Sequence, residues 1–416
     1  MPDELSAAAV EQAAARLAPV VRRTPLDRSD RLSSLHGFPV GLKREDSQLC
    51  RSYKVRGAYN VISSLSPEER RGGVVCASAG NHAQGVAFAC RDLQIEGRIF
   101  LPATTPRQKR QRIAAIGGDW VTAVIIGSSY DEAAAAAAAD RERTGAISVH
   151  PFDDARTIVG QGTVGVEVSE QSNEPIDTLV MPVGGGGLIA GMALWFREHH
   201  PATTLIGAEP AAAASMAAAL AHGGPVALEH VDTFVDGAAV SRVGEITFPV
   251  VRALVDEMVT VPEGAVCTEM IELYQDEGII AEPAGALASA ALNQPLVRPP
   301  EGLTVCVVSG GNNDVSRYGE VLERSLLHEG LRHYFLVTFP QEPGALRHFL
   351  DDVLVQGQDI VVFEYVKKNN RETGPALVGI DLERPSDIGD LLARMAASPL
   401  QIERVPPGSP LFSFLV

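Results

Sequence analysis

The feature that most constrains the fold is an alternation, from about Val40 to Val308, of short apolar runs with longer stretches of helical periodicity. Runs such as GVVCAS, TLVMPVGGGG and LTVCVVSGGNN are apolar before they end in glycine or small polar residues. Strands this apolar have no solvated face, which is typical of parallel sheets covered by helices on both sides. Because ligands of such α/β folds bind beyond the carboxyl ends of the strands, we expect the site among these endings.

The pattern changes after about residues 317–330. Strand-like HYFLVTF, helical GALRHFLDDVL, and strand-like DIVVFEYV and ALVGIDL follow one another, before helical DIGDLLARMAA and strand-like QIERV. This βαββαβ order predicts a ferredoxin-like α+β domain that is built separately. We therefore expect a large α/β domain over residues 1–325, in which a smaller subdomain at about 50–155 is inserted, and a small α+β domain over residues 326–416.

Composition argues against two classes of partner. The formal net charge is -17, whereas binding to a nucleic-acid backbone needs an excess of lysine and arginine. No apolar run approaches the roughly 20 residues of a membrane span, and the N-terminus lacks a cationic leader. The five cysteines are scattered without a C-x-x-C pair, which is typical of reduced thiols. We expect a soluble, cytoplasmic protein.

The segment SYKVRGA places Lys54 behind Ser52 and Tyr53. Ser52 is a suitable N-cap residue, so the sequence predicts a helix whose first turn contains Lys54. The positive end of a helix dipole disfavours an ammonium group and lowers its pKa. A neutral amine at this position suits a Schiff base with a carbonyl group, whereas a single lysine taken alone is more often a surface cation.

The segment VGGGGLIAG follows a predicted buried strand and opens a helix. The successive backbone N–H groups of Gly184–Gly187, with the helix dipole behind them, predict a phosphate cradle. A tight turn is the simpler interpretation, but a turn does not need four glycines. A dinucleotide site is the sharper alternative, because Gly185, Gly187 and Ala190 satisfy G-x-G-x-x-A and Glu209 ends the next strand about 20 residues on.

Two further strand endings carry polar groups. SAGNHAQG, from Ser78 to Gly85, offers hydroxyl, amide and backbone donors at a helix start, which suits a carboxylate or a phenolic oxygen. His82 is a candidate general base here, although a histidine in the first turn of a helix is more often structural. SGGNND begins with Ser309, whose hydroxyl can donate to or accept from a ring nitrogen; alone, the segment is typical of a turn.

Taken together and in this order, SYKVRGA, SAGNHAQG, GGGGL and SGGNN resemble the fold-type-II pyridoxal-phosphate enzymes and, within them, the threonine dehydratases, over about residues 5–325. Tyr53 stands where phenylalanine is usual and keeps the aromatic ring. The resemblance implies pyridoxal 5'-phosphate as cofactor and Lys54 as the catalytic lysine that carries it. It also implies cofactor binding by Tyr53, Lys54, Asn81, Gly184, Gly185, Gly186, Gly187, Leu188 and Ser309, and binding of the substrate carboxylate by Ser78, Ala79, Gly80, Asn81 and His82.

Two departures from this family narrow the activity. Its serine racemases carry a second serine directly after the first serine of the asparagine loop, as a base on the opposite face, and this chain has Ala79 there. The same relatives bind a divalent metal through a glutamate and a nearby aspartate. Glu209 is present, but the following PAAAASM offers only Ser215. We therefore expect neither racemisation nor a bound metal.

The C-terminal segment HYFLVTFPQEPGALRHFLDDV resembles the ACT-like regulatory domain of biosynthetic threonine dehydratases. In such domains the strand-to-helix turn presents backbone groups to an amino-acid effector, here at Glu342, Gly344, Ala345 and Leu346. The resemblance implies feedback inhibition by isoleucine, often opposed by valine. Because only one such domain is present, paired effector sites would require a dimer or tetramer. A pure oligomerisation module is the alternative.

The leading interpretation is pyridoxal-phosphate-dependent β-elimination and deamination of L-threonine, and of L-serine, to 2-oxobutanoate or pyruvate and ammonia, as the first step of isoleucine biosynthesis. One alternative is a nicotinamide-dependent oxidoreductase that uses the loop at 185–190. Another is a non-catalytic amino-acid sensor, which the retention of Lys54, Asn81 and Ser309 disfavours. Arg56 has no role in these interpretations, and we expect it to form a structural ion pair.

Overall fold

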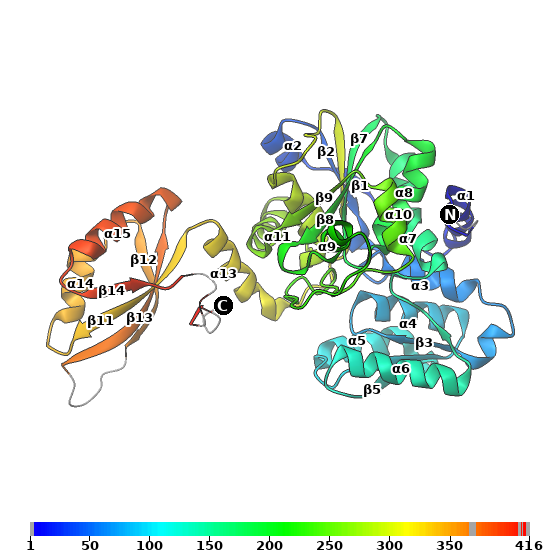
Figure 1. Ribbon diagram of the computed structural model, residues 1–416, viewed down its shortest axis with the longest axis horizontal. Helices are drawn as coiled ribbons and strands as arrows, with labels where there is room; N and C mark the ends of the chain where they lie inside the picture. Colours follow the sequence, from blue (N-terminus) through cyan, green and yellow to red (C-terminus); the bar gives the residue numbers. More distant parts are fainter. Residues whose placement is uncertain (1–3, 366–371, 407–408, 410, 413–416) are drawn as a thin grey trace. The chain divides into compact units, whose positions relative to one another are not determined.

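Figure 1 shows the computed structural model of the chain, which describes residues 4–365, 372–406, 409, 411 and 412. The chain divides into two compact units, residues 1–313 and residues 314–416. This division falls earlier in the chain than the boundary between residues 325 and 326 that we placed from the sequence, and that boundary stays a prediction.

The larger sheet of the first unit has six strands in the order β1-β2-β10-β7-β8-β9. All neighbouring strands run parallel except the β1–β2 pair. Strands β8 and β10 are buried along their whole length, as the uninterrupted apolar runs predict for a sheet covered on both faces. The strands are β1 (Leu26–Arg28), β2 (Val40–Arg44), β7 (Ile176–Pro182), β8 (Thr204–Pro210), β9 (Glu257–Val261) and β10 (Leu303–Val308).

Helices lie on both faces of this sheet, with α8 and α10 on one side and α11 on the other (Figure 1). Side chains of α1, α7, α8 and α10 share one hydrophobic core with β7, β8 and β10. The helices are α1 (Ala7–Leu17), α2 (Asp30–His36), α7 (Ala155–Gln171), α8 (Gly187–His199), α9 (Ser215–His222), α10 (Thr247–Leu254), α11 (Glu263–Glu277) and α12 (Pro283–Ala290).

The smaller sheet of the first unit has four parallel strands in the order β5-β4-β3-β6. Its strands are β3 (Val74–Ala77), β4 (Gly97–Leu101), β5 (Val121–Ile125) and β6 (Ile147–Ser148), and its helices are α3 (Lys54–Ser63), α4 (Asn81–Leu93), α5 (Arg107–Gly117) and α6 (Tyr130–Thr144). Helix α3 packs on α4 and on α7. It therefore joins the smaller sheet to the helices of the larger one.

The second unit has the predicted βαββαβ order after an initial helix, α13 (Tyr318–His328). Its four strands lie in the order β12-β13-β11-β14, and every neighbouring pair is antiparallel. This topology confirms the ferredoxin-like α+β prediction. The elements are β11 (Arg332–Pro340), α14 (Ala345–Val353), β12 (Gln358–Tyr365), β13 (Thr373–Leu382), α15 (Ile388–Ala397) and β14 (Gln401–Arg404), with buried Phe335, Phe339 and Phe349 in the core.

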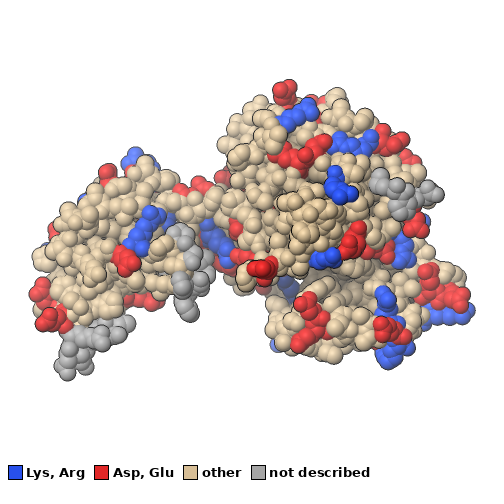
Figure 2. Space-filling view, in the orientation of Figure 1, with Lys and Arg blue, Asp and Glu red and all other residues tan. Residues whose placement is uncertain are grey.

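Among the described residues, no helix combines the length and the apolarity that crossing a membrane requires. On the face shown in Figure 2, lysine and arginine side chains are interspersed with aspartate and glutamate instead of forming a patch of one sign.

Candidate active site

Lys54 is the first residue of α3, so the prediction that it lies in the first turn of a helix is confirmed. Its Nζ donates a hydrogen bond to the carbonyl oxygen of Pro151 at 3.1 Å. Desolvation by the surrounding protein lowers the pKa of Lys54 to about 8, while the nearby carboxylate of Glu282 acts in the opposite direction. The main cause is thus burial of the amine, where we had expected the helix dipole. A substantial fraction of the amine is neutral near physiological pH.

The expected N-cap role of Ser52 is wrong. Tyr53 occupies the N-cap position of α3, and no side chain caps the helix. Ser52 instead forms an isolated antiparallel bridge with Gly310, and the N–H of Tyr53 donates to the carbonyl oxygen of Ser309 at 3.2 Å. The backbone before α3 is therefore attached to the loop after β10. This attachment brings the segments of Lys54 and Ser309 together.

The glycine loop lies between β7 and α8 and follows the predicted phosphate-cradle pattern. Gly186 has a φ of 92°, a conformation that favours glycine, and serves as the N-cap of α8 without a side-chain cap. A Cβ atom on Gly185 would lie 2.2 Å from the ring of Phe152, so no side chain fits there. An uncapped helix start made of close-packed glycines leaves backbone N–H groups for an anion. The residues present fit a phosphate group.

Asn81 begins α4 at the carboxyl end of β3. Its Nδ2 donates to Oε1 of Glu282 at 2.5 Å, and its Oδ1 accepts a hydrogen bond from Nδ2 of Asn312 at 2.8 Å. The second carboxylate oxygen of Glu282 accepts from the backbone N–H of Asn312 at 3.2 Å. Three loops that are distant in sequence thus meet at this asparagine.

The rest of the Ser78–His82 loop leaves space at its centre. Nothing lies within 4 Å of a Cβ atom built on Gly80, and this residue is the N-cap of α4 without a side-chain cap. An open helix start of this kind suits a carboxylate. His82 is buried, and its Nε2 lies 2.8 Å from the carbonyl oxygen of Val149. Burial lowers the pKa of His82 to about 3, so its ring is neutral and is poorly matched to proton transfer near pH 7.

Ser309 is buried at the end of β10, and its hydroxyl donates to the carbonyl oxygen of Ala284 at 3.1 Å. The structure connects the predicted segments through direct contacts. Lys54 contacts Pro151, whose neighbour Phe152 packs against the glycine loop, and Tyr53 contacts Ser309. The hydrogen bond from Asn312 to Asn81 connects the fourth segment to the loop after β10, so the four segments converge on one site.

Glu282 belongs to the site and is not among the residues predicted from the sequence. This residue is the N-cap of α12, is buried, and bonds to Asn81 and Asn312. Desolvation, and next the negative charge of Asp236, raise the pKa of Glu282 to about 7. The only sequence signal is a glutamate before proline in AEPAGA, which is also typical of an ordinary helix start.

Glu209, the acidic residue of the alternative dinucleotide interpretation, is not available to bind a ribose hydroxyl, because both of its carboxylate oxygens are already hydrogen-bonded. Its two carboxylate oxygens accept hydrogen bonds from the backbone N–H groups of Met216 at 2.6 Å and Ala217 at 2.8 Å, at the start of α9. Burial raises the pKa of Glu209 to about 7. Because both oxygens bind the start of α9, the residue caps a helix.

The predicted effector turn lies in the second unit, between β11 and α14. Gly344 has a φ of 94° and is the N-cap of α14, which has no side-chain cap. Ala345 is buried beneath the turn, whereas 41% of Leu346 is exposed. An uncapped helix start beside an exposed apolar side chain is suited to an amino acid with an apolar side chain.

Each of the two units matches a known protein family. Residues 17–310 match the family described as pyridoxal-phosphate dependent enzyme, and residues 323–415 match the C-terminal regulatory domain of threonine dehydratase. The chain is 59% identical to L-threonine dehydratase biosynthetic IlvA of Mycobacterium tuberculosis over 414 residues, which covers 99% of this chain and 96% of that protein. It is 52% identical to the protein of that name from Corynebacterium glutamicum over 416 residues, covering 99% and 95%.

Two solved structures are similar to most of the chain. The processed form of threonine deaminase isoform 2 from Solanum lycopersicum matches with a TM-score of 0.72 and 39% identity, over 78% of this chain and 94% of that one. Maize serine racemase matches with a TM-score of 0.71 and 33% identity, over 78% and 98%.

Proposed function

The chain belongs to the family of pyridoxal-phosphate-dependent enzymes, and from that premise we propose that it converts L-threonine to 2-oxobutanoate and ammonia at the start of isoleucine biosynthesis. L-serine would give pyruvate in the same way. The observation that carries the proposal is identity to biosynthetic threonine dehydratases over nearly the whole chain, with both units included. The convergence of the four predicted segments around Lys54 supports it independently.

Each part of the cofactor has a candidate partner in the site. Lys54 would hold pyridoxal phosphate covalently through its amine, and Gly184–Leu188 would hold the phosphate at the start of α8. Asn81 would bind the phenolic oxygen, Ser309 would meet the ring nitrogen, and Tyr53 would lie beside the reactive lysine. When bound, the cofactor withdraws electrons from Cα of the amino acid, which makes the Cα proton removable.

The proton chemistry then rests on Lys54. With a pKa of about 8, its amine is neutral often enough near pH 7 to accept a proton at Nζ. The Ser309 hydroxyl is uncharged and does not force a ring nitrogen to stay protonated, unlike a carboxylate. A ring that is not kept protonated would withdraw electrons only moderately, and this favours prompt loss of the β-hydroxyl group from the substrate. His82 stays neutral and would help shape the carboxylate seat formed with Ser78, Ala79, Gly80 and Asn81.

The second unit would sense an amino acid. We infer that isoleucine binds at the turn from Glu342 to Leu346, and that valine opposes it. The support is the match to the threonine dehydratase regulatory domain and the uncapped start of α14. A dimer or tetramer that pairs these turns, and a cytoplasmic location, are further predictions.

The test is ammonia release from L-threonine, measured with and without isoleucine, for the parent and for Lys54→Ala. Turnover by Lys54→Ala should fall at least about a thousandfold, because this amine both carries the cofactor and accepts the proton. Arg23→Ala is a control, since Arg23 makes an exposed ion pair with Glu170 on the surface. Ordinary turnover by Lys54→Ala, or a colourless parent that binds NAD, would refute the proposal.

A further inference from the structure

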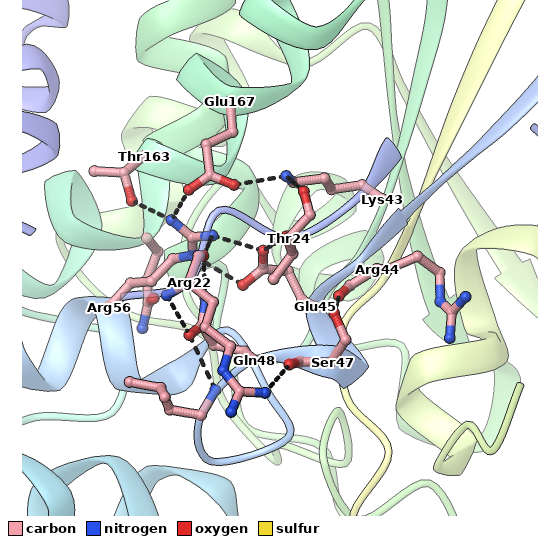
Figure 3. A network of polar contacts seen from close by, with 12 residues as sticks. Arg22, Thr24, Lys43, Arg44, Glu45, Ser47, Gln48, Arg56, Thr163 and Glu167 are labelled. Carbon is pink, nitrogen blue, oxygen red and sulfur yellow. Dashed lines mark hydrogen bonds and ion pairs between the residues drawn. The ribbon is translucent and has the colours of Figure 1, made fainter. Parts of the chain in front are cut away.

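Beneath the first turn of α3 lies a group of four charged side chains, which we call the α3 charge network (Figure 3). It consists of Lys43 on β2, Glu45 in the turn that follows β2, Arg56 on α3 and Glu167 on α7. The side chains of Lys43, Glu45 and Arg56 are at most 1% exposed, and that of Glu167 is 13% exposed. Two positive and two negative charges cancel, so the network has no net charge.

Arg56 is the centre of this network. Its Nε and Nη2 donate to the two carboxylate oxygens of Glu45 at 2.8 and 2.7 Å. Its Nη1 donates to Glu167 at 2.7 Å and to the hydroxyl of Thr163 at 3.3 Å, and Nη2 also reaches the carbonyl oxygen of Arg22 at 3.4 Å. These contacts use all five N–H groups of the guanidinium, a planar geometry that lysine cannot reproduce.

Lys43 completes the network from the other side of Glu167. Its Nζ donates to Glu167 at 2.6 Å, to Gln171 at 2.9 Å and to the carbonyl oxygen of Thr24 at 2.7 Å. All three ammonium protons therefore have acceptors. A buried network in which every donor is satisfied permits one arrangement and resists small displacements.

The network acts on the helix that begins with Lys54. Arg56 lies two residues after Lys54, and the next N–H, that of Gly57, donates to Oε1 of Gln161 on α7 at 3.1 Å. On the opposite side, the bridge between Ser52 and Gly310 fixes the backbone before the helix. The first turn of α3, which carries the reactive amine, is therefore fixed by the Ser52–Gly310 bridge before it and by the contacts of Arg56 and Gly57 after it.

We propose that Arg56 is a positioning residue for Lys54: through Glu45 and Glu167 it fixes the first turn of α3 on α7 and thereby sets where the amine lies. Arg56 touches neither substrate nor cofactor in this role. The inference rests on the reactive role proposed for Lys54. Stability alone is a weak reason for such a network, because buried ion pairs contribute little net stability compared with apolar residues of similar size.

The test measures the amine itself. In the full chain freed of pyridoxal phosphate, competitive acylation by a trace of acetic anhydride, with mass-spectrometric readout across pH, gives the pKa and reactivity of Lys54. The parent has only five lysines, at positions 43, 54, 109, 367 and 368. Arg56→Lys adds a sixth in the same peptide as Lys54, and fragmentation of that peptide distinguishes the two labelled amines. The titratable groups that face Lys54 are Tyr53 before α3, Glu282 at the N-cap of α12, His82 on α4 and His150 before α7, and all stay unchanged in the variants.

Two variants perturb the network differently. Arg56→Lys keeps the charge and loses the planar donor geometry, whereas Glu167→Gln keeps the shape and loses a charge. Glu167 and Arg56 both border a cavity of about 540 Å³ between α1, α7 and α8. The Glu167 side chain is the more exposed of the two, so water can compensate for its lost charge and Glu167→Gln should fold. If the turn loosens and admits water, the pKa of Lys54 rises by about one, and its neutral fraction at pH 7 falls about tenfold. In the holoenzyme, kcat for threonine should fall more than KM changes.

Arg31→Lys is the matched control. Arg31 also bonds to several carboxylates, those of Glu269, Glu272 and Glu277 on α11, at 2.8, 2.5 and 3.2 Å. The substitution Arg31→Lys should lower the midpoint of thermal unfolding without changing the pKa or the reactivity of Lys54. The proposal is supported if the pKa or the reactivity of Lys54 changes in either network variant and both stay at the parental values in Arg31→Lys.

A lower thermal midpoint with parental pKa and reactivity of Lys54 in every network variant that folds would overturn the positioning role. If Arg56→Lys does not fold, Glu167→Gln decides alone. Failure of the underlying function looks different, because the parent holoenzyme would then release no ammonia from L-threonine, whatever the pKa of Lys54.

Discussion

At the scale of single residues, the site holds two ionisable groups whose environments shift them in opposite directions. Lack of solvent lowers the pKa of Lys54 to about 8 and raises that of Glu282 to about 7. Near neutral pH, both groups therefore interchange readily between charged and neutral forms. Pairs of this kind are typical of sites that move protons.

Glu282 gives a stability prediction whose sign follows from its raised pKa. Between its ordinary value of about 4.5 and its folded value of about 7, the unfolded chain has lost the proton that the folded chain still binds. Its contribution to stability is thus full below pH 4.5 and is lost as pH rises to 7. Relative to the parent, Glu282→Gln should gain about 3 kcal/mol over this interval, at about 1.36 kcal/mol per pH unit.

Urea unfolding at pH 5, 6, 7 and 8 checks this prediction. Tryptophan fluorescence is a suitable signal, because the two tryptophans, Trp120 and Trp195, both lie in the first unit. Parent and variant curves that keep a constant separation from pH 5 to pH 8 would contradict the raised pKa.

At the scale of elements, the crossing of α3 and α7 depends on two glycines. A Cβ atom on Gly160 would lie 2.9 Å from Cα of Gly57, 2.8 Å from Cβ of Asn60 and 3.0 Å from the carbonyl oxygen of Arg56. Two of these atoms belong to the backbone, so a methyl group cannot be accommodated by a side-chain rotation. The helices approach closely because glycine is present.

Gly160→Ala should therefore destabilise the first unit by about 1–3 kcal/mol, the usual cost of overpacking. The effect has to exceed the gain of up to about 1 kcal/mol that alanine brings to a helix interior. Gly224→Ala is the matched control, because nothing lies within 4 Å of its Cβ position. Equal urea midpoints for the two variants would contradict close contact between the helices.

Much of the element pattern follows from the sequence, because apolar periodicity and glycine endings act locally. The helix from Asn81 to Leu93 and its preceding strand lie where the pattern places them. Long-range contacts were not predictable in the same way. Ser52 has the composition of a cap, yet its backbone pairs with Gly310, and Glu282 resembles an ordinary helix start until Asn81 is brought against it. Arg56 was expected to form a structural ion pair, and it does bond to Glu45 and Glu167.

At the scale of the whole molecule, the chain consists of two units with separate hydrophobic cores. Units with their own cores can unfold in separate steps. A ligand that binds only the folded form of one unit then stabilises that unit by mass action.

Isoleucine should therefore raise the temperature of the calorimetric transition of the second unit. At a concentration of 100 times its Kd, it should raise the free energy of unfolding of that unit by about 2.7 kcal/mol. D-isoleucine is the control ligand. Tryptophan fluorescence reports the first unit and identifies its transition, since both tryptophans lie there. A shift that appears only in the fluorescence transition would place the isoleucine site in the first unit.

The neutrality of the α3 charge network has a consequence for engineering. Because its charges cancel and its donors are all bonded, replacing any one member by an uncharged residue leaves the buried network with a net charge. A library that varies these positions one at a time will therefore find Lys43, Glu45 and Arg56 intolerant of uncharged residues, whereas Glu167, which borders the cavity, accepts glutamine. A library that varies all four together can reach apolar combinations that no series of stable single steps connects to the parent. Replacement of the network by apolar residues therefore requires that all four residues change together.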